Sequence, residues 1–127
     1  MKEDVKYWVD LSKYDIDTAK AMLESGRYLY VLFTCQQSVE KMLKALIVKN
    51  TKSFPPKIHD LVKLIKFARI DIEPEQKEFL AKLNYYYIET RYPGELSEIS
   101  KQIKKDTAVD FYNNTKKIVK WLKSIAL

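Results

Sequence analysis

The sequence predicts an all-α protein, folded as an up-and-down antiparallel bundle of four long helices and one short helix. Glycine is scarce, at 2 of 127 residues, and the 4 prolines interrupt the chain at only three places. Between those places apolar residues recur at steps of three and four, which is the helical period. The length suits one domain, residues 1–127, with a core that needs no metal or disulfide for its stability.

Two long helices are expected in the first fifty residues. The first covers residues 3–25, and Gly26 supplies its end. The second covers residues 28–50 and is apolar on most of its sides. A helix of that kind is usually buried all round, so we expect it at the centre of the core.

Prolines place the next three elements. Residues 51–58 contain Pro55-Pro56 and are predicted to be a loop, because proline lacks a backbone donor and restricts the residue before it. A short helix is expected over residues 59–68. Pro74 suits the first turn of a fourth helix, which we expect to run through the tyrosine-rich segment to Arg91 and to be stopped by Pro93.

The last helix is expected to begin between residues 96 and 106 and to end near residue 124. The net charge of +6 is concentrated there, with seven lysines and two aspartates in residues 101–127. Such a helix can attract phosphates, but lysines at 116, 117, 120 and 123 also describe the solvated face of an amphipathic helix. We favour the second interpretation.

The composition favours the cytoplasm. The lone Cys35 cannot form an internal disulfide, and its apolar helical setting suits a reduced core side chain. Charged residues follow Met1 at once and no run of 18 apolar residues occurs, so we expect neither a secretory signal nor a membrane span.

Few residues can carry metal or phosphate chemistry of the common kinds. One histidine and one cysteine cannot assemble the usual zinc set, and the isolated Gly26 and Gly94 cannot form a phosphate-cradling loop. We therefore expect no metal and no cofactor. His59 is the only candidate imidazole for acid–base work, but its place at the start of a predicted helix favours a capping role for it.

Polar side chains on the two apolar helices need partners. Asp15 lies among apolar neighbours on the first helix, and an unpaired buried carboxylate costs several kcal/mol. We expect Arg91 as its partner, and Lys44 as the second choice. Gln37 and Glu40 lie on the second helix, where Glu40 and Lys44 also form a favourable pair four residues apart.

Arg91 is the first candidate for ligand binding. Its planar guanidinium suits a carboxylate or a phosphate, and the rings of Tyr85 and Tyr92 could stack on a base. We predict a ligand site centred on Arg91, with Lys44 and Tyr92 nearest to it and Asp15 orienting it. Tyr85, Gln37 and Glu40 complete the set of candidate ligand-binding residues.

Three pieces of the chain carry a family resemblance: residues 35–46, the step His59-Asp60-Leu61 and residues 85–93. In this order and spacing they resemble the HEPN family of small helical domains found in prokaryotes beside nucleotidyltransferases. The resemblance covers nearly the whole chain. HEPN domains are helical bundles that commonly pair, so it implies this fold and, together with the large apolar content, a homodimer.

The resemblance also has a gap. HEPN ribonucleases carry an arginine, four to six further residues and then a histidine, and the three positions open to that histidine after Arg91 hold Leu96, Ser97 and Glu98. The leading hypothesis is therefore a non-catalytic nucleotide-binding or accessory subunit that acts with a separately encoded nucleotidyltransferase, as in a toxin–antitoxin pair. RNA is a lesser expectation as ligand.

Two alternatives stay open. One is a metal-independent ribonuclease or toxin in which His59 replaces the missing histidine, and it requires His59 and Arg91 to converge. The other is a purely structural helical interaction protein.

Overall fold

The chain consists of helices and connecting loops. The computed structural model describes residues 2–127, and within them there are six α-helices, one short 3₁₀ helix and no strand. In chain order they are α1 (Lys2–Glu24), α2 (Tyr28–Thr51), α3 (Leu61–Ala68), α4 (Pro74–Asn84), η1 (Ile88–Thr90), α5 (Pro93–Gln102) and α6 (Lys105–Ala126). The predicted all-α bundle with antiparallel main helices is confirmed.

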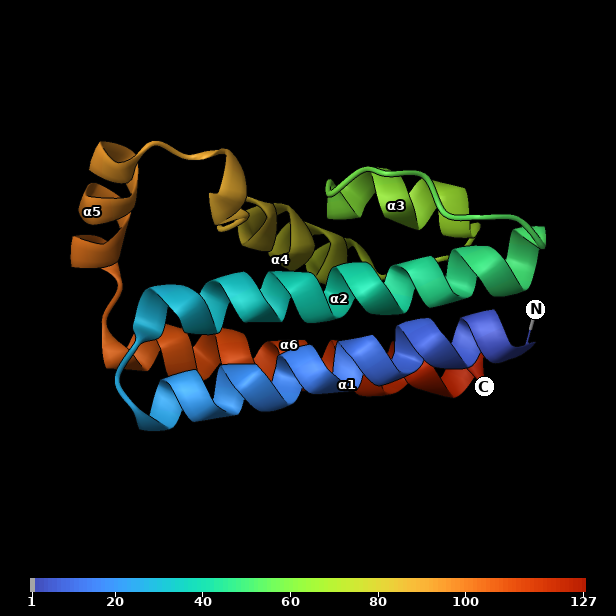
Figure 1. Cartoon of the computed structure of the whole chain (residues 1–127), viewed down its shortest axis with the longest axis horizontal. Coiled ribbons are helices and arrows are strands. Elements are labelled where there is room, and N and C mark those ends of the chain that lie inside the picture. Colours follow the sequence, from blue (N-terminus) through green and yellow to red (C-terminus); the bar gives the residue numbers. More distant parts are fainter. Residues whose placement is uncertain (1) are drawn as a thin grey trace.

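Three long helices, α1, α2 and α6, lie along one another (Figure 1). α1 and α2 form an antiparallel hairpin, and α3 and α4 cover the opposite side of α2. α5 stands at one end of the bundle and leads the chain back into α6, so both termini lie near the other end (Figure 1). α2 is thus enclosed by neighbours, as its apolar pattern predicted, and its residues from Val31 to Val48 are largely buried.

The region after α4 differs from the prediction. The helix does not run on to Arg91: it ends at Asn84, and Tyr85 and Tyr86 form a turn before η1. Pro93 begins α5 instead of stopping α4, so the bundle has one more helix than predicted. The physical reason is that proline fits the first turn of a helix as well as it ends one, and Glu95 in that turn interacts favourably with the helix dipole.

Among the described residues, no helix is both long and apolar enough to cross a bilayer. Across the same residues, no three His, Cys, Asp or Glu side chains gather in a way that could hold a metal ion.

Candidate functional site

A surface cavity of about 360 Å³ lies where three separate segments meet. The segments are the loop before α3, the end of α4 and the stretch from η1 to the first turn of α5. Its lining is mostly polar and comprises His59, Asp60, Asn84, Tyr87, Thr90, Arg91 and Glu95. We call it the His59–Arg91 pocket.

His59 is held on two sides. Its Nδ1 lies 2.9 Å from Oε1 of Glu40, and its ring stacks on Tyr87 with 4.3 Å between centroids and 16° between planes. The side chain is still 46% exposed. When Nδ1 donates to the carboxylate, Nε2 is the basic nitrogen of a neutral imidazole, and no described residue engages it.

Glu40 is buried and shared among several groups. Its Oε1 also accepts a hydrogen bond from Gln36, at 3.2 Å, and its Oε2 lies 3.0 Å from Nζ of Lys44. Lys44 is itself buried and stands 5.6 Å from the centroid of the Trp8 ring. This network ties the loop that carries His59 to the centre of α2, and Gln36 adds a bond of 3.1 Å to the His59 carbonyl.

Asp60 and Asn84 line the pocket and connect it to the start of α3. Oδ1 of Asp60 caps α3 by accepting from the backbone N–H groups of Val62 and Lys63, at 3.0 and 3.3 Å. Asn84 donates to the same oxygen at 2.9 Å and accepts from the N–H of Leu61 at 2.8 Å. The predicted capping role of His59 is therefore wrong, because α3 starts at Leu61 and Asp60 is its N-cap.

Arg91 also lines the pocket. Its guanidinium stacks over the ring of Tyr85, 4.3 Å from the centroid, and donates to the Tyr85 carbonyl at 2.9 Å. One further bond of 3.2 Å joins Nη1 to Oε2 of Glu95. Arginine has five N–H donors, so this leaves others free for a ligand.

Tyr87 forms the wall behind His59. Burial of its ring, together with its hydrogen bond of 2.9 Å to the Glu89 carboxylate, raises the pKa of Tyr87 to about 12. The hydroxyl is therefore protonated at neutral pH and acts there as a hydrogen-bond donor.

Several predicted site residues lie elsewhere. The expected pairing of Asp15 with Arg91 is wrong, because Asp15 binds Lys41 across the α1–α2 hairpin at 2.7 Å. Lys44 is bound to Glu40 and does not line the pocket, and Gln37 donates to Gln36. Neither residue is placed to accompany Arg91.

The two predicted tyrosines differ in position. Tyr85 lies under the Arg91 guanidinium. Tyr92 is the N-cap residue of α5 and is 77% exposed, directly after Arg91 in the chain.

The candidate site residues predicted from the sequence did not include five residues of the pocket: Asp60, Asn84, Tyr87, Thr90 and Glu95. Glu95 had a readable signal, since an acidic residue two places after Pro93 is typical of a helix start. Asn84 had a weaker one, as a poor helix former at the end of an apolar pattern. Thr90 and Tyr87 line the pocket because η1 follows the end of α4. The sequence of this short 3₁₀ helix has no pattern that predicts its position.

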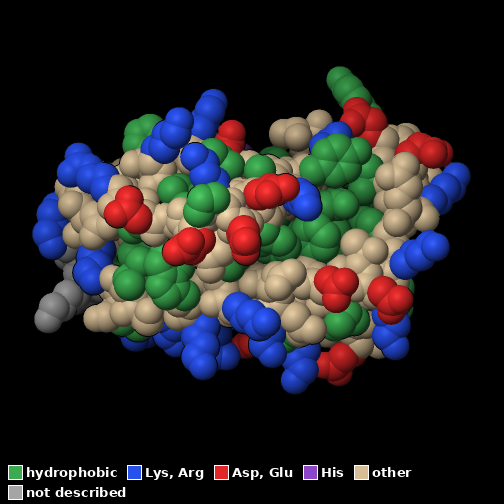
Figure 2. Space-filling view, turned by 180° about the vertical axis from the view of Figure 1, so that it is seen from behind, with side chains coloured by type: hydrophobic (Ala, Val, Ile, Leu, Met, Phe, Trp, Pro, Cys, Tyr) green, Lys and Arg blue, Asp and Glu red, His purple; other side chains and the backbone are tan. Residues whose placement is uncertain are grey.

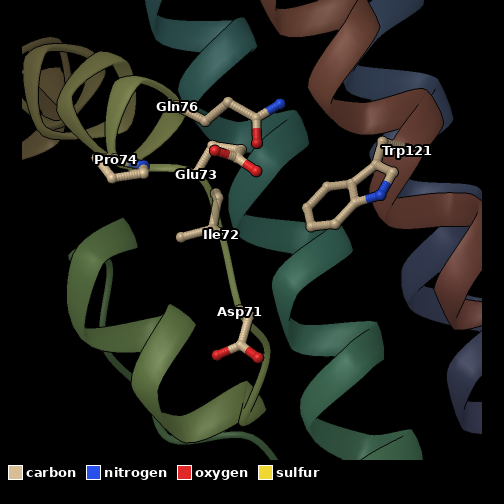
Figure 3. A pocket seen from close by; sticks show the side chains of 6 residues that line it. All are labelled: Asp71, Ile72, Glu73, Pro74, Gln76 and Trp121. Atoms are coloured by element: carbon tan, nitrogen blue, oxygen red, sulfur yellow. The ribbon is translucent and has the colours of Figure 1, made fainter.

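A second cavity, of about 390 Å³, is lined by acidic side chains and lacks basic ones. It lies between the α3–α4 connection and α6, where the Trp121 ring faces Asp71, Ile72 and Glu73 (Figure 3). Its lining contains two carboxylates and no cationic side chain. An anionic ligand is therefore better served by the His59–Arg91 pocket.

Comparisons with known proteins agree with this architecture. The family model described as the HEPN domain matches residues 5–125. The crystal structure of TT1696 from Thermus thermophilus superposes with a TM-score of 0.81 at 22% identity, covering 97% of this chain and 98% of that one. ST0689, an archaeal HEPN homologue, gives a TM-score of 0.77 at 19% identity, covering 97% and 98%.

A third crystal structure, the HEPN domain protein tm0613 from Thermotoga maritima, gives a TM-score of 0.70 at 21% identity and covers 94% of this chain and 96% of that one. At these identities the structures show a shared fold and no more. No curated protein sequence matches the chain.

Proposed function

The chain belongs to the HEPN domain family, and on that premise we propose that it is a nucleotide-binding accessory subunit whose ligand occupies the His59–Arg91 pocket. The observation that carries the proposal is the convergence of donors from three segments on one cavity. His59, Asn84 and Arg91 are separated widely in the sequence but line the same space.

These donors suit a phosphate group. The guanidinium of Arg91 has free N–H groups, the Asn84 amide lines the same pocket, and His59 can add a donor at Nε2 when it is protonated. The exposed ring of Tyr92 follows Arg91 directly and can stack on a base. A phosphate contact and a base contact together support a nucleotide as the ligand class.

Two carboxylates, those of Asp60 and Glu95, also line the pocket, and their negative charge lowers its affinity for a phosphate. Asp60 is engaged through Oδ1 by three donors and has a structural role as a cap. Glu95 pairs with Arg91 at the surface, where its side chain is 48% exposed. An exposed pair of this kind is weak, so a phosphate can displace Glu95 from the guanidinium.

The partner we propose is a separately encoded nucleotidyltransferase, in a pair of the toxin–antitoxin type. The support is the family resemblance, because HEPN proteins of this type work beside such enzymes. Co-purification of this chain with the product of the neighbouring reading frame tests the pairing.

Nucleotide binding is tested by calorimetric titration and thermal melts with AMP, ADP, ATP and inorganic phosphate. At about one hundred times its dissociation constant, a ligand should stabilise the protein by about 2.7 kcal/mol, which raises the melting temperature by about ten degrees. Arg91→Lys should weaken binding by about tenfold or more, because lysine keeps the charge but loses the planar fork.

Glu95→Gln should tighten binding, since it frees the guanidinium. Arg27→Lys is the matched control, because Arg27 is an exposed arginine at the start of α2 that does not line the pocket. The proposal fails if no nucleotide shifts the wild-type melt, or if the Arg91 and Arg27 variants bind alike.

A second candidate, metal-independent RNA cleavage, is favoured by one observation. His59 is oriented by Glu40 in the same pocket as Arg91, which is the convergence this activity requires. Nε2 of His59 could take the proton of a ribose 2′-hydroxyl as that oxygen attacks phosphorus, while Arg91 stabilises the negative charge on the phosphate oxygens. The bond from phosphorus to the 5′ oxygen then breaks, and that oxygen takes a proton from water, because His59 is the only histidine of the chain.

Incubation with single-stranded and structured RNA in EDTA distinguishes the two candidates. Cleavage that disappears in both His59→Ala and Arg91→Ala would establish the ribonuclease. Binding without cleavage supports the accessory subunit.

A further inference from the structure

His59 has one ring nitrogen fixed and the other open. Its Nδ1 lies 2.9 Å from Oε1 of Glu40, a carboxylate that is only 3% exposed. Among the described residues, no side chain engages Nε2, although the imidazole is 46% exposed. A hydrogen bond from Nδ1–H to the carboxylate fixes the tautomer that leaves the lone pair on Nε2. Nε2 is therefore available as a nucleophile as well as a base.

The ring of His59 is also held in one orientation. It stacks on Tyr87, with 4.3 Å between the centroids and 16° between the planes. The buried Gln36 donates a hydrogen bond of 3.1 Å to the His59 carbonyl, so the backbone of the same residue is fixed as well. A nucleophile that is already fixed in place loses little freedom when it reacts, which lowers the barrier of the reaction.

Arg91 supplies positive charge for a phosphoryl group. It lines the same cavity as His59, and its bonds to Glu95 and to the Tyr85 carbonyl leave N–H donors free. Guanidinium donors stabilise the oxygens of a phosphoryl group during its transfer. The chain also has a net charge of +6, and Lys and Arg side chains stand around much of the outline of the molecule in Figure 2, which attracts anionic molecules.

We infer that His59 is a phosphoryl acceptor, and that its Nε2 takes the phosphoryl group of an acyl phosphate. This activity goes beyond the proposed function, because it forms a covalent bond and requires neither a base nor a ribose. Phosphorylation and nucleotide binding are measured separately, so the failure of one leaves the other standing.

The step balances without the transfer of a proton. The lone pair of Nε2 attacks phosphorus and forms an N–P bond, while the bond from phosphorus to the acyl oxygen breaks. The carboxylate leaves with that electron pair, and the ring becomes an imidazolium that keeps its proton on Nδ1. No group is oxidised or reduced. The new positive charge lies beside the carboxylate of Glu40, which acts as a positioning residue and stabilises the product.

The leaving group favours an acyl phosphate over RNA as the donor. A carboxylate is stable as an anion, whereas the 5′ oxygen of a ribose has to take a proton as it leaves. His59 is the only histidine of the chain, and it cannot be the nucleophile and the proton donor in the same step.

The probe is acetyl phosphate, and the product is followed by phosphorus NMR and by mass spectrometry of the intact chain. Because the chain has one histidine, a phosphorus signal that couples to imidazole protons belongs to His59. Phosphorus couples to both ring protons when it is bound to Nε2, and to only one of them when it is bound to Nδ1. The assay therefore reports the rate and the nitrogen that reacts.

Four variants accompany the wild type. His59→Gln removes the acceptor, and Glu95→Gln frees the guanidinium of Arg91. Arg91→Gln removes the donors, and Arg27→Gln is its matched control, because Arg27 is an exposed arginine outside the pocket and the change in net charge is the same. Thermal melts show whether each variant is folded.

We expect the folded protein to react at Nε2 alone, and about tenfold faster or more than the same chain unfolded in urea. His59→Gln should give no N-phosphorylated imidazole, and Glu95→Gln should react faster than the wild type. Arg91→Gln should slow the reaction about tenfold or more, and Arg27→Gln should change it by less than about twofold.

The inference does not depend on the Arg91 variant alone, since the nitrogen that reacts is read from the wild type. Reaction at Nδ1 in the folded protein, equal rates for the folded and the unfolded chain, or equal rates for folded Arg91→Gln and Arg27→Gln would each overturn it.

Discussion

The carboxylate of Glu40 lies 2.9 Å from Nδ1 of His59, so a buried charge of α2 orients the only histidine of the chain. The same carboxylate neutralises Lys44, which is also buried. The stability of the core and the geometry of the pocket therefore depend on one side chain.

Glu40→Gln should destabilise the protein by about 3 kcal/mol, because it leaves Lys44 buried without its anion. Urea unfolding measures the loss, and Glu40→Gln combined with Lys44→Met should recover much of it. Asp10→Asn is the control, since it breaks an exposed pair with the same spacing and should change little. An equal effect of Glu40→Gln and Asp10→Asn would contradict the buried network.

Asp60→Ala should cost about 1 to 2 kcal/mol, the usual penalty for the loss of a helix N-cap. The variant leaves the N–H groups of Val62 and Lys63 without their acceptor and releases the Asn84 amide. Asp71→Ala, in the exposed connection before α4, is the comparison, and thermal melts of the two variants decide the matter. If Asp60→Ala and Asp71→Ala had the same melting temperature, the cap formed by Asp60 would not contribute to stability.

The Cys35 thiol should resist alkylation in the native state. Burial raises the pKa of Cys35 from 9.0 to about 12, so the reactive thiolate is almost absent at pH 8. Iodoacetamide should modify it slowly in buffer and quickly in urea, as followed by mass spectrometry. Rapid native labelling would show that α2 opens easily.

The raised pKa also predicts a pH dependence. The folded state holds the proton more tightly than the unfolded state, so this contribution to stability is complete below pH 9 and is lost as the pH rises toward 12. Cys35→Ala should reduce the slope of unfolding free energy against pH in that interval.

Much of the fold could be predicted because it depends on local patterns. α2 is apolar on nearly all sides, and a helix of that kind has to be central in a bundle. Pro93 was harder, because the same residue can end one helix or begin the next. α4 ends at Asn84, whose side chain binds Asp60 and the backbone N–H of Leu61, and these partners lie more than twenty positions earlier in the chain, where no local pattern reveals them.

The site was less predictable because it depends on how helices are rotated about their axes. Asp15 was expected to pair with a cation, and it does. The cation is Lys41, which faces it across the α1–α2 hairpin. Periodicity shows which side of a helix is apolar and does not specify which cation of a neighbouring helix comes within reach. The convergence of His59 with Arg91 likewise depends on the turn after α4.

We predict that the protein is a symmetric homodimer. Large side chains remain exposed on its surface, among them Tyr14 at 72%, Tyr92 at 77% and Phe54 at 92%. Burial of such rings is a common driving force for two-fold association. Light scattering at micromolar concentration should give twice the mass of the chain, and a monomer mass would contradict the prediction.

The most direct test of the central claim uses the imidazole of His59, because its ring proton signals in an NMR spectrum belong to one histidine only. Titration with AMP should shift these signals with a saturable dependence on concentration; Arg91→Lys should need about tenfold more AMP or more to reach the same shift, and Arg27→Lys should titrate like the wild type. If AMP, ADP and ATP at millimolar concentration leave the His59 signals in place, no nucleotide occupies the pocket that His59 shares with Arg91, and the account is wrong.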